Sequence, residues 1–213
     1  LYVNNDFGKG GHATIKGLLA TGPTQIVTEI STESGQVDFS AAVIQAKQSG
    51  ADALFAYTNE EESARLLREL RKQAWNKPVI GETVLTSAKV VELAGEAANG
   101  AVAHVGLTVE APQLQAWGKK FQAAYNTSSD HNGVKGYTGV YVLKAAIEKA
   151  GKVDRKAAAA AIRNSCFTAK QYPGVLMDVC FDDKGDIDRE SFITEIRNGK
   201  TVVAETLPPM SKK

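Results

Sequence analysis

The residues best suited to bind a small molecule follow two short apolar segments, Asp52–Tyr57 and Lys77–Gly81. Both segments are rich in strand-forming residues, and Asn59–Gln73 between them has leucines at helical spacing. A strand, a helix and a second strand with short joints predict a parallel, right-handed crossover. In such sheets, ligands bind beyond the carboxyl ends of the strands. The sequence therefore predicts half of a small-molecule site at the polar residues that follow the strands: Tyr57, Thr58, Asn59, Glu60, Glu82 and Thr83.

Other kinds of chemistry find little support in the sequence. The glycine-rich joint Asn4–Gly11 matches neither G-x-G-x-x-G nor G-x-x-x-x-G-K-[ST], which favours a capping Asp6 with closely packed glycines over phosphate binding. The acidic cluster Asp182–Asp186 lacks the spacing of a calcium loop and predicts a tight turn. Because no paired acid and base, nucleophile elbow or metal cluster is visible, we predict a binding protein without enzymatic activity, cofactor or metal.

Composition narrows the class of protein further. The chain has 213 residues, is 43% hydrophobic and 23% charged, and has a net charge of +1. This charge gives no overall field that would favour nucleic acid or a membrane surface, so we predict neither partner. The two cysteines, Cys166 and Cys180, lack a C-x-x-C spacing and could either pair or remain as buried thiols. The chain begins without Met, at a strand-like Leu1–Val3, which predicts a mature product or part of a longer protein.

Up to residue 109, segments of strand and helix character alternate along the chain. This alternation predicts an α/β fold with a doubly wound, mostly parallel sheet. The expected strands are Leu1–Asn5, Thr24–Ile30, Asp52–Tyr57, Lys77–Gly81 and Ala101–Val109. The expected helices run from Gly11 to about Ala20 and over Phe39–Gln48 (capped by Asp38), Asn59–Gln73 and Ser87–Leu93.

The pattern changes after residue 109. Three helices are expected without strands between them, over Gln113–Tyr125, Gly136–Ala150 and Asp154–Asn164, and their apolar faces lack an obvious partner in this chain. A strand over Val175–Phe181 and a hairpin that turns at Asn198-Gly199 complete the expected structure. The three helices cannot belong to the repeating sheet, so they must pack on something else.

The order of the motifs resembles that of the periplasmic branched-chain amino-acid binding proteins, the Leu/Ile/Val receptors of ABC importers. The motifs include N-D-F-G-K-G, K-P-V-I-G, L-A-G-E-A-A-N-G-A-V, G-Y-T-G-V-Y-V-L-K-A-A-I-E-K-A-G and I-R-N-G-K-T-V-V. The resemblance implies a type I periplasmic binding fold of two α/β lobes joined by crossing strands. Residues 1–107 and 189–207 would form the second lobe, and 108–188 a returning segment of a first lobe whose N-terminal part is missing.

The resemblance also implies a periplasmic location, ABC permease subunits as partners, and a cleft that closes on a small molecule by hinge motion. With an incomplete first lobe, the uncovered helices favour a dimer or an exchange of elements between copies. Two alternatives share the fold class. One is a ligand-sensing regulator or receptor domain, and the other is an enzyme of doubly wound type.

By this resemblance, Phe7 supplies an aromatic surface, the segment Tyr57–Glu60 supplies a second group, and an acidic residue near Glu82-Thr83 pairs with the ligand ammonium. The sequence departs from the family at two of these places. The family's acidic position falls on Thr83, one residue after Glu82, and the expected tyrosine falls near Glu60. The ligand is therefore expected to be an amino acid or another small carboxylate, such as an aromatic acid.

Overall fold

The computed structural model describes residues 1–212, and the chain divides into two compact units. Unit 1 comprises Leu1–His104 and Ile193–Ala204, and unit 2 comprises Val105–Phe192 and the residues from Glu205 onward. Within the described residues, no helix combines the length and the hydropathy that crossing a bilayer requires. The assignment of the two units to the lobes of a binding protein stays a prediction.

Unit 1 is built around a parallel sheet. Its elements are β1 (Tyr2–Val3), α1 (Asp6–Leu19), β2 (Ser31–Thr32), α2 (Ser40–Gln48), β3 (Leu54–Ala56), α3 (Glu60–Lys72), β4 (Val79–Glu82), η1 (Thr83–Thr86), α4 (Ala88–Ala94), η2 (Gly95–Ala98) and β5 (Ala101–Val105). The hairpin of β9 (Ser191–Arg197) and β10 (Lys200–Leu207) adds to it. Both residues of its Asn198-Gly199 turn have positive φ, 50° and 70°, as the sequence predicted.

The strand order shows that the sheet is doubly wound. Five strands run in the order β10-β9-β5-β4-β3, with β3, β4 and β5 parallel. The parallel pair β1-β2 continues this sheet, because Tyr2 forms a parallel bridge with Tyr57, directly after β3. The order β2-β1-β3-β4-β5 reverses direction between β1 and β3, which confirms the predicted fold class.

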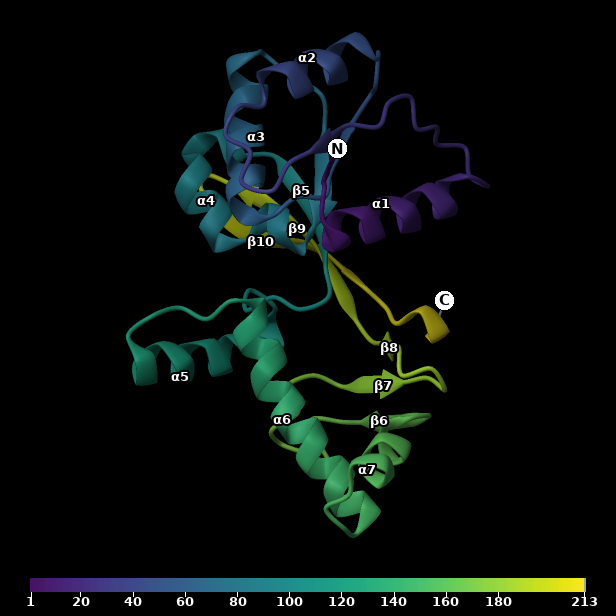
Figure 1. Cartoon of the computed structure of the whole chain (residues 1–213). Helices are drawn as coiled ribbons and strands as arrows, with labels where there is room; N and C mark the ends of the chain where they lie inside the picture. Colours follow the sequence, from purple (N-terminus) through teal and green to yellow (C-terminus); the bar gives the residue numbers. More distant parts are fainter. Residues whose placement is uncertain (213) are drawn as a thin grey trace. The chain divides into compact units, whose positions relative to one another are not determined.

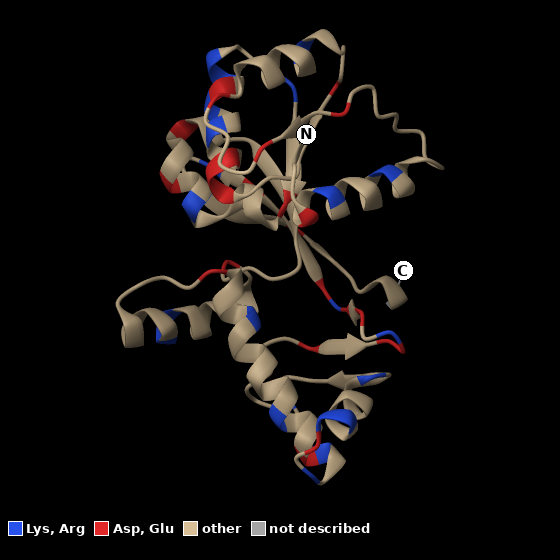
Figure 2. Cartoon of the chain, in the orientation of Figure 1, with Lys and Arg blue, Asp and Glu red and all other residues tan. Residues whose placement is uncertain are grey.

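The helices of unit 1 lie on both sides of the sheet. Helices α3 and α4 lie on one side, and α1 lies on the other (Figure 1). Helix α3 buries Leu66, Leu67 and Leu70, and it carries Arg68 and Arg71 on its exposed side. Lys, Arg, Asp and Glu lie mainly on the helices and loops, whereas the strands carry few of them (Figure 2).

Unit 2 combines helices with a small antiparallel sheet. Its elements are η3 (Pro112–Leu114), α5 (Gln115–Tyr125), α6 (His131–Ala150), α7 (Arg155–Ile162), β6 (Ser165–Phe167), β7 (Val179–Phe181), β8 (Ile187–Asp188) and η4 (Met210–Lys212). Its core joins α6 and α7 to β6 and β7, with Phe167 and Val179 buried against Ala146. Cys166 faces Cys180 across β6 and β7, and the two form a disulfide.

Three expectations about strands and caps were wrong. No strand covers Thr24–Ile30; the ladder to β1 involves only Ile30 to Thr32, with the N–H of Tyr2 donating to the carbonyl of Ile30 at 2.9 Å. The cap of α1 is Asn5, not Asp6, because Asn5 has an extended backbone and its side chain accepts from the N–H of Gly8. The strand expected over Val175–Phe181 is confined to β7.

Two further boundaries in unit 2 differ from expectation. Helix α6 begins at His131 rather than at Gly136, because Asp130 caps it by accepting from the N–H groups of Asn132 and Gly133, both at 2.9 Å. Strand β6 was not expected, and its three residues gain their order from pairing with β7. The predicted turn at Asp182 is confirmed, since its Oδ1 accepts from the N–H groups of Lys184 and Asp186.

Candidate ligand-binding site

Two aromatic rings meet where β1 and β3 end. The rings of Phe7, in the first turn of α1, and Tyr57, directly after β3, have centroids 4.5 Å apart. This is the place where the strand order reverses, and in open α/β sheets such a switch point is where ligands bind. Phe7 is 39% exposed, so part of its ring is available to a ligand. Sequence reasoning placed both residues at this rim, and the structure brings them together.

Glycines in the β1–α1 joint allow this close approach. A Cβ on Gly8 would lie 1.9 Å from the carbonyl oxygen of Val3, and one on Gly11 would lie 2.3 Å from the ring of Tyr57. Neither distance is sterically possible, so any side chain at these positions would displace β1 or Tyr57. The sequence predicted that these glycines allow close helix packing, and this is confirmed. The contact of Gly11 with the ring of Tyr57 is an addition that the structure makes.

Glu82 adds a carboxylate to the rim. Its Oε1 accepts from the N–H of Val84 at 2.9 Å and so caps η1. Tyr57 and Glu82 follow the paired residues Ala56 and Gly81, so both lie at the same edge of the sheet. Burial raises the pKa of Tyr57, and the negative charge of Glu82 raises it further. A carboxylate beside aromatic faces can hold an ammonium group, because both interact favourably with a cation.

The remaining predicted site residues are placed less favourably. Thr58 is buried, and its hydroxyl is hydrogen-bonded to that of Ser63 at 2.8 Å. The side-chain amide of Asn59 donates to Glu62. Glu60 and Thr83, at the first positions of α3 and η1, are both half-buried. Ligand contact by these four residues stays a prediction, and Thr58 has almost no free surface for it.

Sequence reasoning missed the residues that β2 brings to the same edge. The side-chain amide of Asn4 donates to Glu33 at 3.0 Å, and that of Asn5 donates to Ser34 at 3.2 Å. Buried Glu62 accepts from the N–H of Gly35 at 2.7 Å and ties this loop to α3. The loop that contains Glu33, Ser34 and Gly35 directly follows β2, and this position at a strand end could have indicated that its residues reach the same edge of the sheet. Residues 1–212 contain no group of three or more metal-ligating side chains.

Comparison with known proteins agrees with this architecture. The chain is 30% identical over 203 residues to the Leu/Ile/Val-binding protein BraC3 of Rhizobium johnstonii, covering 93% of this chain and 54% of that protein. A leucine-binding protein LivK of Thermotoga maritima superposes with a TM-score of 0.83 at 21% identity, over 98% of this chain and 59% of that one.

A solute-binding protein of Rhodopseudomonas palustris, solved in complex with benzoate, has a TM-score of 0.82 at 20% identity, over 98% of this chain and 57% of that one. These neighbours establish the fold, which is the type I periplasmic binding fold. The chain spans about half the length of the curated relatives it matches. The profile of the periplasmic binding protein family matches residues 1–201, and the chain therefore belongs to that family.

Proposed function

We propose that this chain is part of the extracytoplasmic solute-binding component of an ABC importer, and that Phe7 and Tyr57 form one wall of its ligand site. The observation that carries the proposal is the ring pair at the switch point of the sheet, with Glu82 at the end of the neighbouring strand. The family and its structural neighbours bind solutes and are not enzymes, which agrees with the prediction that the chain is not one.

The proposed ligand is an amino acid or a related small carboxylate. Both amino acids and aromatic acids are proposed because of what similar proteins bind. BraC3 is named for binding Leu, Ile and Val, and two structural neighbours were solved with benzoate and 3,4-dihydroxybenzoic acid. The aromatic pair suits the apolar part of either ligand. Glu82 favours a ligand that carries an ammonium group, because a carboxylate beside the ring pair would repel a bare acid.

The lobe assignment and the partners belong to the same proposal. Unit 1 corresponds to the second lobe, and unit 2 to the returning segment of the first. The ligand site closes by hinge motion between the lobes, and permease subunits receive the loaded protein. The exposed apolar side chains of α6, such as Val140 and Leu143, support a dimer or an exchange of elements between copies.

Thermal unfolding of the chain in the presence of Leu, Ile, Val, benzoate and dihydroxybenzoate tests this function. At ten times the dissociation constant, a ligand stabilises the folded state by about 1.4 kcal/mol. We expect at least one ligand to do so for the wild-type chain and for Tyr125→Ala, which removes an exposed tyrosine from unit 2. Tyr57→Ala should abolish the stabilisation. Stabilisation that survives Tyr57→Ala would place the site elsewhere.

A further inference from the structure

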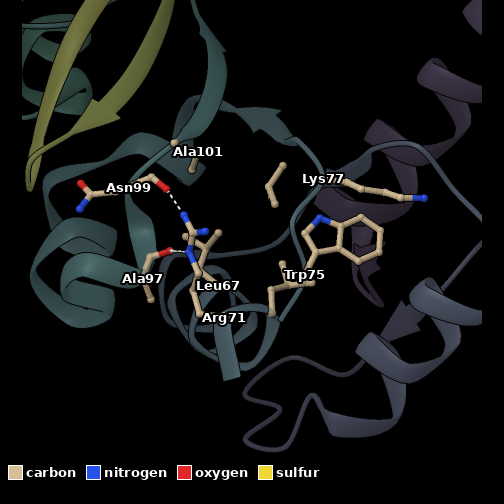
Figure 3. A pocket seen from close by; sticks show the side chains of 10 residues that line it. Leu67, Arg71, Trp75, Lys77, Ala97, Asn99 and Ala101 are labelled. Atoms are coloured by element: carbon tan, nitrogen blue, oxygen red, sulfur yellow. Dashed lines mark hydrogen bonds between the residues drawn. The ribbon is translucent and has the colours of Figure 1, made fainter. Parts of the chain in front are cut away.

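A surface pocket lies at the edge of the unit 1 sheet opposite to the Phe7–Tyr57 rim. It sits where β4 and β5 begin, beside the last turn of α3, and it is open to solvent, with a cavity volume of about 40 Å³ (Figure 3). Most of its wall is apolar, formed by Leu67, Leu70, Val79 and Ala101. No Asp or Glu lines it. The pocket is too far along the strands to belong to the rim, so its chemistry must be explained separately.

Trp75 contributes an unpartnered donor to this pocket. Its side chain is only 6% exposed, and its Nε1 has no hydrogen-bond partner within the described part of the chain. The nitrogen-bearing edge of the indole faces the pocket, whereas the six-membered ring turns towards Lys77 (Figure 3). Buried donors in native proteins almost always have an acceptor. An acceptor entering the pocket would supply one here.

Arg71 lies across the pocket from Trp75 (Figure 3). Its Nε donates to the carbonyl of Ala97 at 3.4 Å, and another guanidinium nitrogen donates to the carbonyl of Asn99. These bonds hold the guanidinium at the pocket and leave further N–H groups for an additional acceptor. The pocket thus combines one fixed positive charge, one buried N–H donor and apolar walls.

Two other charged or dipolar groups lie near the pocket, the ammonium of Lys77 and the carboxyl end of α3, and neither changes the positive charge that Arg71 gives to it. The ammonium of Lys77 points away from the pocket and donates to the carbonyl of Ala51 (Figure 3). The last carbonyls of α3 are already bonded, since those of Leu70 and Arg71 accept from the N–H groups of Trp75 and Ala74. The negative end of the helix dipole is therefore covered rather than directed at the pocket.

We propose that this pocket binds a short-chain carboxylate. One carboxylate oxygen accepts from Nε1 of Trp75, the guanidinium of Arg71 balances the charge, and the alkyl chain packs against Leu67 and Val79. A phosphate fits less well, because a doubly charged, strongly hydrated anion needs more donors than one guanidinium and one indole provide. This site is independent of the proposed solute site.

Nuclear magnetic resonance of the indole N–H groups tests the proposal directly, because the chain has only two tryptophans. Sodium butyrate is titrated at constant ionic strength, with sodium chloride and sodium phosphate as separate arms. The Trp75 indole resonance should shift saturably with butyrate only, and that of Trp117, in unit 2, should stay unchanged. No shift with butyrate would overturn the proposal and would mean that ordered water is the partner of the indole N–H. Equal shifts with all three salts would overturn it as well, because they would show a general effect of salt.

Substitutions then test the role of the guanidinium. Arg71→Gln should weaken butyrate binding about tenfold or more, as expected for losing a charged hydrogen-bond donor. Arg68→Gln is the matched control, since Arg68 lies on the same helix, is exposed and does not line the pocket. If Arg71→Gln perturbs the native spectrum, Arg71→Lys replaces it. A lysine keeps the charge but lacks the planar fork of five N–H donors, so binding should again weaken. Unchanged affinity in the folded variant would contradict the proposal.

Discussion

Helix α3 of unit 1 and helix α6 of unit 2 bury their apolar residues to different extents. In α3, the leucines Leu66, Leu67 and Leu70 are all buried, and the outer face is charged. In α6, Val142, Ala145 and Ala146 are buried, but Val140 is 66% and Leu143 is 50% exposed. Helix α3 therefore buries its leucines within unit 1, whereas α6 presents apolar side chains that the rest of unit 2 does not cover. The stability of unit 1 should depend on packing, and that of unit 2 on its disulfide and on whatever covers α6.

The two tryptophans allow this difference to be measured, because Trp75 lies in unit 1 and Trp117 in unit 2. Trp75→Phe and Trp117→Phe each leave a single fluorescent reporter for one unit. Denaturant unfolding of these backgrounds then gives a free energy of unfolding for each unit.

The largest effect is expected from Leu66→Ala in α3. Removing a fully buried leucine leaves a cavity and costs about 2–5 kcal/mol of stability. The loss should be seen by Trp75 and not by Trp117. Leu18→Ala in α1 is the control, since Leu18 is 71% exposed, and its effect should stay within about 0.5 kcal/mol. Equal destabilisation of both reporters by Leu66→Ala would mean that the units unfold as one.

The double substitution Cys166→Ser with Cys180→Ser should act on the other unit. The disulfide closes a loop with a sequence separation of 14 residues, and removing a cross-link of that length costs about 3 kcal/mol. The Trp117 transition should move to lower denaturant concentration, and the Trp75 transition should not. Reduction of the wild-type chain is the matched treatment and should give the same shift. A Trp117 transition that does not move would show that α6 and α7 hold unit 2 together without the cross-link.

Replacing Val140 and Leu143 with Lys should change the stability of unit 2 little. Both side chains are exposed, so the effect should be within about 0.5 kcal/mol for each. Val142→Lys on the same helix is the contrasting control, because Val142 is buried and a charge there should unfold unit 2. Sedimentation of the wild-type chain and of the variant with Lys at positions 140 and 143 shows whether the exposed face also joins two copies. A dimer of the wild-type chain that becomes monomeric in the variant would support the dimer proposal.

The smallest expected effect concerns Tyr57. The pKa of its phenol is raised, mainly by burial and secondly by the charge of Glu82. A folded-state pKa above the unfolded value contributes stability at lower pH, and this stability is lost as alkaline pH rises through the folded pKa. Glu82→Gln should lower the Tyr57 pKa part of the way to its ordinary value. The pKa of Tyr57 is measured from the phenolate absorbance of the wild-type chain and of Glu82→Gln, each after subtracting the absorbance of the same chain with Tyr57→Phe. A Tyr57 pKa that is unchanged by Glu82→Gln would show that the Glu82 carboxylate does not act on the ring pair.

Local signals explain why part of the fold could be predicted. The unit of β3, α3 and β4 was placed to within a few residues, because the leucine spacing and the charged first and last turns of α3 lie within the segment itself. The Asn198-Gly199 turn is equally local. From the strand–helix–strand pattern, the sequence also placed Tyr57 and Glu82 at one edge of the sheet, whereas Phe7 was expected there from the family resemblance.

Tertiary pairing explains what could not be predicted. Alternation along Thr24–Ile30 could not show that only its last residue would pair with β1, which lies far away in the chain. The contacts of Glu33 with Asn4, and the pairing of Cys166 with Cys180, depend on strand registers that the sequence left open. These features are set by neighbours in space and not by neighbours in the chain.

Mapping amide shifts of the chain during a titration with leucine and, separately, benzoate would test the solute-site proposal most directly. We expect saturable shifts at Phe7 and Gly8, at residues 57–60, and at Glu82 and Thr83, with one dissociation constant for all three segments. Saturable shifts confined to other residues, or no shift at the three segments with either ligand, would contradict the assignment of this rim as the wall of the ligand site.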